Sequence, residues 1–257
     1  MSIHYIIGHR GALEYAPENT MLSFEKAVEL GANAIEGDFR MTRDGACVCI
    51  HDETVDRTTN GKGRVEEMTL SEIRKLDAGA GQKVPTLAEF VQFAIQKKVL
   101  GFVEINSPGM EPAVLDVIQE QKATKENIVI ISFFPETLKN VIKLNNKLPL
   151  GLIFSIAAEN IISVAAEIPC SSILPEKSLV TKELVETAHT NRLAVIPWNA
   201  NTAEEAKKLE NLDVDSLATD QPKIVKAAVK FQPPQLAAAQ APVPKVVETP
   251  PPIILLK

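Results

Sequence analysis

Two acidic residues, Glu36 and Asp38, have the type and spacing that metal chemistry requires. They end an apolar stretch at residues 34–39 that reads as a β-strand. Alternate side chains of a strand point to opposite faces, so these two carboxylates share a face. Two like charges this close repel unless a cation lies between them, and oxygen ligands are those that Ca²⁺ and Mg²⁺ take. The pair therefore predicts a divalent-cation site, with an exposed acidic strand face as the alternative.

The next segment brings a histidine toward this pair if its turn is tight. Asp44-Gly45 is a strong turn signal, and residues 46–51 read as a strand returning along the first. A turn centred on Asp44 and Gly45 pairs Asp38 with His51, whose side chains would then share a face. A slip of one residue would place His51 on the other face.

Short strands and helices alternate along most of the chain and must position these residues. The expected strands are residues 3–8, 34–38, 46–51, 99–105, 128–132, 150–154, 171–174, 193–198 and 214–218. The expected helices begin near residue 20 and at residues 86–97, 135–145, 158–166, 181–190, 202–209 and 221–229. Without the returning hairpin strand, eight parallel strands remain, which predicts an α/β fold of the (β/α)₈ TIM-barrel type. A doubly wound open sheet is the competitor, but no Gly-rich dinucleotide turn follows the first strand.

A barrel would gather the polar and aromatic residues that end its strands, because catalytic side chains lie at the C-terminal strand ends. The residues that fall there are His9, Glu36, Asp38, Glu104, Ser132, Phe133, Trp198, Thr219 and Asp220. Because these residues would lie together at the C-terminal ends of the strands, we expect the active site there.

The chain divides into a barrel domain at residues 1–230 and a Pro/Ala-rich tail at residues 231–257. The tail composition predicts an extended or disordered segment. Within the barrel domain, residues 52–85 are rich in glycine and are expected to form a small lobe inserted after the second strand. This lobe is expected either to cap the site or to be a long ordered loop.

The composition argues against several classes of binding partner and location. The net charge is −6 and no Lys/Arg run stands out, which argues against nucleic acid. No apolar run is long enough to span a membrane, and the N-terminus lacks the shape of a signal peptide. Cys47 and Cys49 lie two apart in a strand, which suits a disulfide poorly, and Cys170 stands alone. Reduced thiols predict a cytoplasmic protein, and the sequence carries no sign of its oligomeric state.

An ordered set of motifs strongly resembles the glycerophosphodiester phosphodiesterase family over residues 3–228. The motifs are His9-Arg10-Gly11, Pro17-Glu18-Asn19-Thr20, Glu36-x-Asp38, Thr42-x-Asp44-Gly45, His51-Asp52, Arg57-Thr58-Thr59-x-Gly61-x-Gly63, Pro85-Thr86-Leu87, Glu104, Trp198-x-x-Asn201 and Thr219-Asp220-x-Pro222. The resemblance implies a distorted TIM barrel with an inserted lobe. It also implies an enzyme that hydrolyses glycerophosphodiesters, small molecules such as glycerophosphocholine or glycerophosphoethanolamine, to an alcohol and sn-glycerol 3-phosphate.

The resemblance further implies one divalent cation, Mg²⁺ or Ca²⁺, held by Glu36, Asp38 and Glu104. It assigns general acid and base roles to His9 and His51. Two imidazoles that titrate near neutrality can divide these roles, one taking a proton from the attacking oxygen and one giving a proton to the leaving alkoxide. Either histidine can be the base, and either water or the substrate's own glycerol hydroxyl can attack.

Substrate binding is implied for Arg10, Phe133 and Trp198. Arg10 would contact the phosphate, for which a guanidinium is suited, and the two aromatic residues would line the glycerol side. Asn106 departs from the family pattern, which has lysine two residues after Glu104. Asn106 should still enter the site because it shares a strand face with Glu104, but it supplies no charge.

Two alternatives keep the fold and change the function. One is lysophospholipase D-type activity on lysophospholipids, which a wide apolar channel beside Trp198 would favour. The other is a non-catalytic relative that binds phosphate and metal, for which Asn106 is the only support.

Overall fold

The computed structural model describes residues 2–145, 147–158 and 160–234. Most of the predicted tail, residues 235–257, lies outside the described residues. Of the first tail residues, Phe231 pairs with Ile3 in a short parallel bridge, and Lys226 lies 5.2 Å from the Phe231 ring. Gln232 donates its backbone N–H to the Ile3 carbonyl at 2.9 Å, so the chain stays in contact with the segment before the first strand as far as Gln232.

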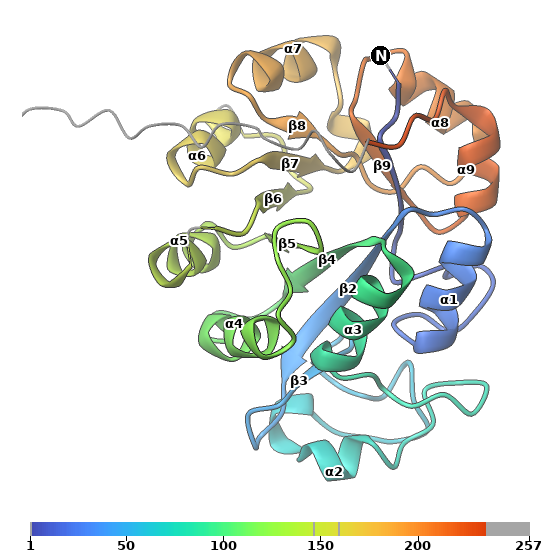
Figure 1. The fold of residues 1–257 in the computed structure, drawn as a ribbon, viewed down its shortest axis with the longest axis vertical. Coiled ribbons are helices and arrows are strands. Elements are labelled where there is room, and N and C mark those ends of the chain that lie inside the picture. The colour runs from blue at the N-terminus through green and yellow to red at the C-terminus, as the bar shows by residue number, and fades with distance from the viewer. Residues whose placement is uncertain (1, 146, 159, 235–257) are drawn as a thin grey trace, which may run out of the picture.

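Eight parallel strands form a nearly closed barrel, which confirms the predicted TIM barrel (Figure 1). They are β1 (Tyr5–Gly8), β2 (Ala34–Met41), β4 (Leu100–Ile105), β5 (Ile128–Ser132), β6 (Leu150–Phe154), β7 (Ser172–Pro175), β8 (Ala194–Val195) and β9 (Ser216–Thr219). Neighbours pair in the order β8-β7-β6-β5-β4-β2-β1-β9. Backbone hydrogen bonds from Asp215 to Val195 and from Ala218 to Pro197, both 3.0 Å long, bridge the seam between β8 and β9.

Helices surround the strands (Figure 1). They are α1 (Met21–Glu29), α3 (Leu87–Lys97), α4 (Glu111–Glu120), α5 (Pro135–Leu144), α6 (Ile161–Glu167), α7 (Lys182–Thr190), α8 (Ala203–Glu210) and α9 (Pro222–Ala228). Thr20, Thr86, Thr181 and Thr202 begin four of them, because each hydroxyl accepts a backbone N–H of the first turn. α4 is not among the predicted helices, and its N-cap residue, Met110, makes no side-chain cap hydrogen bond.

Apolar side chains fill two layers. Phe24, Phe39 and Phe90 pack edge to face between strands and helices, with ring centroids 5.0 and 5.3 Å apart. Ile7 and Phe102 belong to a separate cluster built from alternate strand residues. Because Phe39 faces the helices, its neighbours in β2, including Asp38, face the barrel interior.

The β2–β3 hairpin has a different register from the one predicted. β3 (Cys47–Cys49) pairs antiparallel with β2, with Arg40 opposite Val48. Ile50 donates its backbone N–H to the Asp38 carbonyl at 2.9 Å. The predicted pairing of Asp38 with His51 is therefore wrong by one residue.

The turn itself explains this shift. Thr42 N–H donates to the Ala46 carbonyl at 2.9 Å, so three residues rather than two lie between the paired positions. Gly45 has a φ of +83°, the left-handed conformation typical of a three-residue hairpin loop. The Thr42 hydroxyl also donates to Asp44 Oδ1 at 2.6 Å and stabilises this longer turn.

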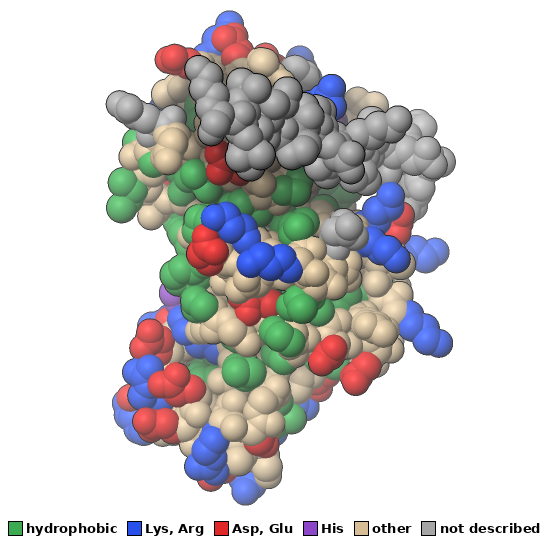
Figure 2. Space-filling view, turned by 90° about the vertical axis from the view of Figure 1, so that its left-hand side faces the viewer, with side chains coloured by type: hydrophobic (Ala, Val, Ile, Leu, Met, Phe, Trp, Pro, Cys, Tyr) green, Lys and Arg blue, Asp and Glu red, His purple; other side chains and the backbone are tan. Residues whose placement is uncertain are grey.

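The inserted lobe carries η1 (Val65–Glu67) and α2 (Leu70–Ile73), and it lies beside one end of the barrel (Figure 1). Thr69 begins α2 with a capping box, as its sequence suggests. The lobe has its own small core, formed by Val48, Ile50, Val55, Val65, Ile73, Ala78 and Val84. At the lobe's end of the molecule, acidic and basic side chains intermingle (Figure 2). Within the described residues, no helix combines the length and apolar character needed to cross a membrane.

Candidate active site

Glu36, Asp38 and Glu104 converge at the C-terminal ends of β2 and β4. Asp38 lies directly opposite Glu104 in the parallel register, and Glu36 precedes Asp38 on the same face. One carboxylate oxygen from each residue lies within 4.8 Å of the others. All three residues are buried, so the strand register concentrates three acids in a small space with little water.

Asp38 is the best-satisfied of the three acids. Its Oδ2 accepts a hydrogen bond from Asn19 Nδ2 at 2.8 Å, and its Oδ1 accepts one from Asn106 Nδ2 at 3.1 Å. Arg10 Nε lies 3.1 Å from Oδ2, as an ion pair rather than an aligned hydrogen bond. These contacts fix the orientation of the Asp38 carboxylate.

Glu36 and Glu104 are held less firmly. Glu36 Oε2 accepts the backbone N–H of Arg10 at 2.9 Å, but its buried Oε1 has no hydrogen-bond partner among the described residues. Burial, followed by the charges of Asp38 and Glu104, raises the pKa of Glu36 well above its usual value. Burial and the charge of Asp38 raise the pKa of Glu104 to about 8. Each acid therefore resists ionisation without a nearby cation.

This donor set fits a hard divalent cation. Three clustered carboxylates offer only oxygen atoms, which Mg²⁺ and Ca²⁺ prefer, and Glu36 Oε1 is an unpartnered acceptor. A cation would also remove the repulsion that raises the two pKa values.

His9 lies at the end of β1 and is oriented by the strand beside it. Because Gly8 pairs with Thr219, the following residues, His9 and Asp220, are neighbours. His9 Nδ1 lies 2.7 Å from Asp220 Oδ1 and 2.9 Å from Asn199 Nδ2. With its hydrogen on Nδ1, the ring donates to Asp220 and leaves the Nε2 lone pair for proton transfer. The Asn199 amide then turns its carbonyl oxygen, otherwise unpartnered, toward the ring.

Asn201 orients the Asp220 carboxylate that contacts His9. Asn201 Nδ2 donates to its Oδ2 at 2.6 Å, and the Asp220 backbone N–H donates to Asn201 Oδ1 at 2.9 Å. Burial by itself would raise the pKa of Asp220, but the hydrogen bond from His9 and its charge lower that pKa below the usual value. An ionised Asp220 stabilises a positive imidazole.

His51 follows β3 and is held by Asp52 and Arg40. Its Nδ1 lies 2.8 Å from Asp52 Oδ1. Its backbone carbonyl accepts a hydrogen bond from Arg40 Nε at 2.7 Å, and Arg40 Nη1 donates to Ser107 Oγ at 3.2 Å. Arg40 shares the β2 face of Asp38 and so ties His51 to the segment that follows Glu104.

Arg10 and Asn106 both reach the acidic cluster. Arg10 Nη1 donates to Glu18 Oε1 at 3.0 Å, in addition to the contacts with Glu36 and Asp38. Asn106 contacts Asp38 as described above. Lys62 of the lobe lies 3.3 Å from Asp56 and is 81% exposed, so its charge pairs with Asp56.

Phe133 and Trp198 form the apolar side of the rim. Their rings meet edge to face, with centroids 5.9 Å apart and an interplanar angle of 87°. Trp198 Nε1 donates to the Leu174 carbonyl at 2.9 Å, which holds the indole in place. Phe134 and Ile156, which follow β5 and β6, are 42% and 78% exposed and extend the apolar surface of these loops.

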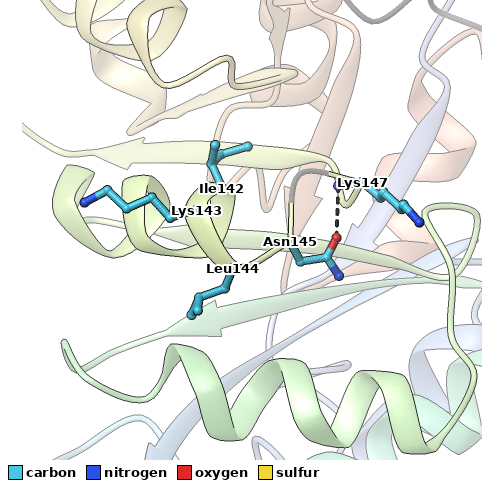
Figure 3. Close-up of a pocket in the computed structure, with 5 residues that line it drawn as sticks. All are labelled: Ile142, Lys143, Leu144, Asn145 and Lys147. Carbon is cyan, nitrogen blue, oxygen red and sulfur yellow. Dashed lines mark hydrogen bonds between the residues drawn. The ribbon is translucent and has the colours of Figure 1, made fainter.

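A hollow of about 350 Å³ lies elsewhere, at the end of α5 (Figure 3). It is lined by Ile142, Lys143, Leu144, Asn145 and Lys147. Its only drawn hydrogen bond joins the Lys147 backbone N–H to Asn145 Oδ1 at 3.0 Å. Among the described residues that line the hollow there is no acid and no histidine.

The sequence places Asp220 on the predicted rim and Asn19 and Arg57 in motifs, but it assigns a specific role in the site to none of these residues. Asn19 could be found from its place just before the helix cap, where its φ of +55° lets the side chain turn inward. Asp220 could be found from barrel closure, which places the end of the last strand beside the end of the first. Arg40 follows Asp38 by two residues in the same strand. Arg57 lies in the lobe, and only its tertiary contacts reveal its role.

The chain has close relatives among known proteins. The sequence model of the glycerophosphoryl diester phosphodiesterase family matches residues 9–224. A glycerophosphodiester phosphodiesterase of Caldanaerobacter subterraneus subsp. tengcongensis is 38% identical over 229 residues, 84% of this chain and 94% of the relative. A glycerophosphodiester phosphodiesterase of Bacillus subtilis is 32% identical over 244 residues, 84% of this chain and 83% of the relative. A solved phosphodiesterase of Oleispira antarctica, in complex with the product sn-glycerol-3-phosphate, is 25% identical with a TM-score of 0.83, covering 88% of this chain and 96% of its own.

Proposed function

The chain belongs to the glycerophosphoryl diester phosphodiesterase family, and on that premise we propose a metal-dependent reaction catalysed by two histidines. The chain is an enzyme, a glycerophosphodiester phosphodiesterase, which acts on a small-molecule phosphodiester. We propose that it releases sn-glycerol 3-phosphate, the product held by the Oleispira antarctica relative. Glycerophosphocholine and glycerophosphoethanolamine are the proposed substrates.

The observation that carries this proposal is the convergence of Glu36, Asp38 and Glu104 within 4.8 Å. These residues would hold one Mg²⁺ or Ca²⁺. When bound, the ion would neutralise charge on the phosphate oxygens and in the transition state. Arg10, anchored to Glu18 by Nη1, would direct the rest of its guanidinium toward the same phosphate.

His9 and His51 would move the protons. His9, fixed through Nδ1 by Asp220, would move a proton at Nε2, either taking it from the attacking oxygen or giving it to the leaving ester oxygen. His51, fixed through Nδ1 by Asp52, would act at the other oxygen. Each carboxylate partner stabilises the imidazolium that forms during its step. The order of the two roles, and the choice between water and the glycerol hydroxyl as nucleophile, stay open.

Phe133 and Trp198 would line the glycerol side of the pocket, while Asn106 would hold Asp38 and add no charge. Because the family match makes the chain an enzyme, the non-catalytic alternative is not proposed further. All three cysteines are free and buried, which supports the cytoplasmic location that we propose.

Lysophospholipids are a second candidate substrate class. Phe133, Phe134 and Ile156 are 39%, 42% and 78% exposed at the ends of adjacent strands. An acyl chain bound against them would cover apolar surface that a choline or ethanolamine head group would leave in water. This alternative keeps the metal, the histidines and the released alcohol, and differs in the acyl chain that the glycerol of the substrate carries.

Release of sn-glycerol 3-phosphate from glycerophosphocholine tests the proposal, with Mg²⁺, with Ca²⁺ and with chelator. We expect activity with an added ion and none with chelator. His51→Ala should remove most turnover, whereas His189→Ala should not, although His189 makes a similar 2.8 Å contact with Asp215. Metal-independent hydrolysis would refute the ion site. Faster cleavage of lysophosphatidylcholine would favour the second substrate class.

A further inference from the structure

Arg57 lies in the inserted lobe and bridges two carboxylates, those of Asp52 and Glu18, each of which contacts a different residue of the site. Its Nε donates to Asp52 Oδ2 at 2.8 Å, and its Nη2 donates to Asp52 Oδ1 at 2.9 Å. Its Nη1 and Nη2 also donate to Glu18 Oε2 and Oε1 at 2.7 and 2.8 Å. One guanidinium therefore makes a two-pronged contact with each acid, the geometry for which arginine is best suited.

Each of these acids holds a residue of the proposed reaction. Asp52 Oδ1 also contacts His51 Nδ1, and Glu18 Oε1 also accepts a hydrogen bond from Arg10 Nη1. A continuous series of charge-assisted contacts thus runs from His51 through Asp52, Arg57 and Glu18 to Arg10. Arg10 then meets the acidic cluster.

We propose that Arg57 is a positioning residue that fixes His51 and Arg10 relative to each other across the substrate phosphate. This inference rests on the proposed function, because it takes the roles of those two residues from there. Through Arg57, the lobe becomes part of the active site without contacting the substrate.

Charge supports the same assignment. The hydrogen bonds from Arg57 hold the pKa of Asp52 far below its usual value. Burial would raise the pKa of Glu18, but hydrogen bonds from Arg57 and the charge of Arg10 lower it. Both acids are therefore anionic at neutral pH, and without Arg57 they would repel an anionic phosphodiester.

A purely structural role, in which Arg57 only attaches the lobe, is the alternative to test. The lobe already has an apolar core that includes Val55, Val65 and Ile73, so its folding does not depend on one half-exposed arginine. Arg64 provides a matched control in the same lobe. It is 43% exposed, compared with 48% for Arg57, and contacts two acids, Glu53 and Glu66, that hold no residue of the site.

The test compares steady-state kinetics of Arg57→Gln, Arg57→Lys and Arg64→Gln on glycerophosphocholine with the added ion, using variants of confirmed native fold. Arg57→Gln should lower kcat by about 100-fold, the scale of a small misplacement of reacting groups, and should also raise KM. Arg57→Lys keeps the charge but not the four hydrogen bonds. It should restore KM and leave kcat low. Arg64→Gln should match the wild type.

The outcomes separate this inference from the proposed function. If His51→Ala is inactive while Arg57→Lys has wild-type kcat and KM, the positioning role is refuted and the proposed function stands. If His51→Ala retains activity, the proposed function fails first. If Arg57→Gln does not fold, Arg57→Lys still decides, because it preserves the charge and changes only the geometry. Equal losses of kcat in Arg57→Lys and Arg64→Gln would also overturn the assignment.

Discussion

Replacing Glu104 by glutamine should make the metal-free protein more stable at alkaline pH. Without an ion, burial and the charge of Asp38 raise the pKa of Glu104 from 4.5 to about 8. Between these values the folded protein binds more protons at this site than the unfolded chain. Its free energy of unfolding therefore falls as the pH rises through that range. Below pH 4.5 Glu104 is protonated in both the folded and the unfolded chain, so it does not lower the free energy of unfolding.

The size of this loss follows from the two pKa values. At about 1.36 kcal/mol per pH unit, the difference between 4.5 and about 8 corresponds to about 5 kcal/mol once the pH exceeds 8. At pH 7 the loss is about 3 kcal/mol on the same basis. A neutral amide of similar shape cannot ionise, so Glu104→Gln removes this term. It also removes a charge that raises the pKa of Glu36.

Urea unfolding with chelator at pH 5, 7 and 8.5 measures the effect. The wild type should lose stability across this series, whereas Glu104→Gln should lose less and be the more stable protein at pH 8.5. Added Mg²⁺ or Ca²⁺ should stabilise the wild type strongly and the variant weakly, because an ion that binds the folded state shifts unfolding. Glu111→Gln is the control, since Glu111 is also buried (2% exposed) but accepts from Asn140 Nδ2 away from the cluster.

Two results would refute this reasoning. One is a metal-free wild type whose stability is the same at pH 5 and pH 8.5. The other is a Glu104→Gln variant less stable than the wild type at pH 8.5 while Glu111→Gln is unchanged. Either would mean that the acids do not repel one another in the folded protein.

Three further predictions concern residues around the cluster. Asp220→Asn should lower kcat by roughly 100-fold with little change in KM, because His9 loses the charge that stabilises its imidazolium; an unchanged kcat in steady-state assays would exclude this role. Asn106→Lys should lower KM for glycerophosphocholine by about tenfold, which corresponds to a charge-assisted contact near the lower end of the usual range of about 1.5–3 kcal/mol. A KM at or above the wild-type value would contradict this prediction. Arg40→Gln should reduce kcat, because it removes the hydrogen bond that holds the backbone carbonyl of His51. Thr187→Ala, on the distant helix α7, is the control and should leave kcat unchanged.

The barrel and the acidic cluster could be predicted because both depend on short-range alternation. Glu36 and Asp38 share a face by strand parity, and Glu104 ends the next barrel strand. The positions of strands and most helices follow from apolar periods and threonine caps. These signals are local, so a single sequence contains them.

The hairpin register and the polar network could not be predicted on the same basis. Gly45 suits both a two-residue and a three-residue loop, and the bond between Thr42 and Asp44 selects the longer one. The contacts of Arg57 with Glu18 span 39 residues of sequence. Side chains of that length can reach many partners, and only the assembled fold selects among them.

The small core of the lobe has a consequence for how the enzyme admits its substrate. Val48 and Ile50 belong both to the hairpin beside Asp38 and to the apolar cluster of the lobe. A swing of the lobe away from the barrel would pull these two buried side chains into water. The lobe is therefore tied to the hairpin beside the acidic cluster, and we expect it to keep this position while the substrate binds.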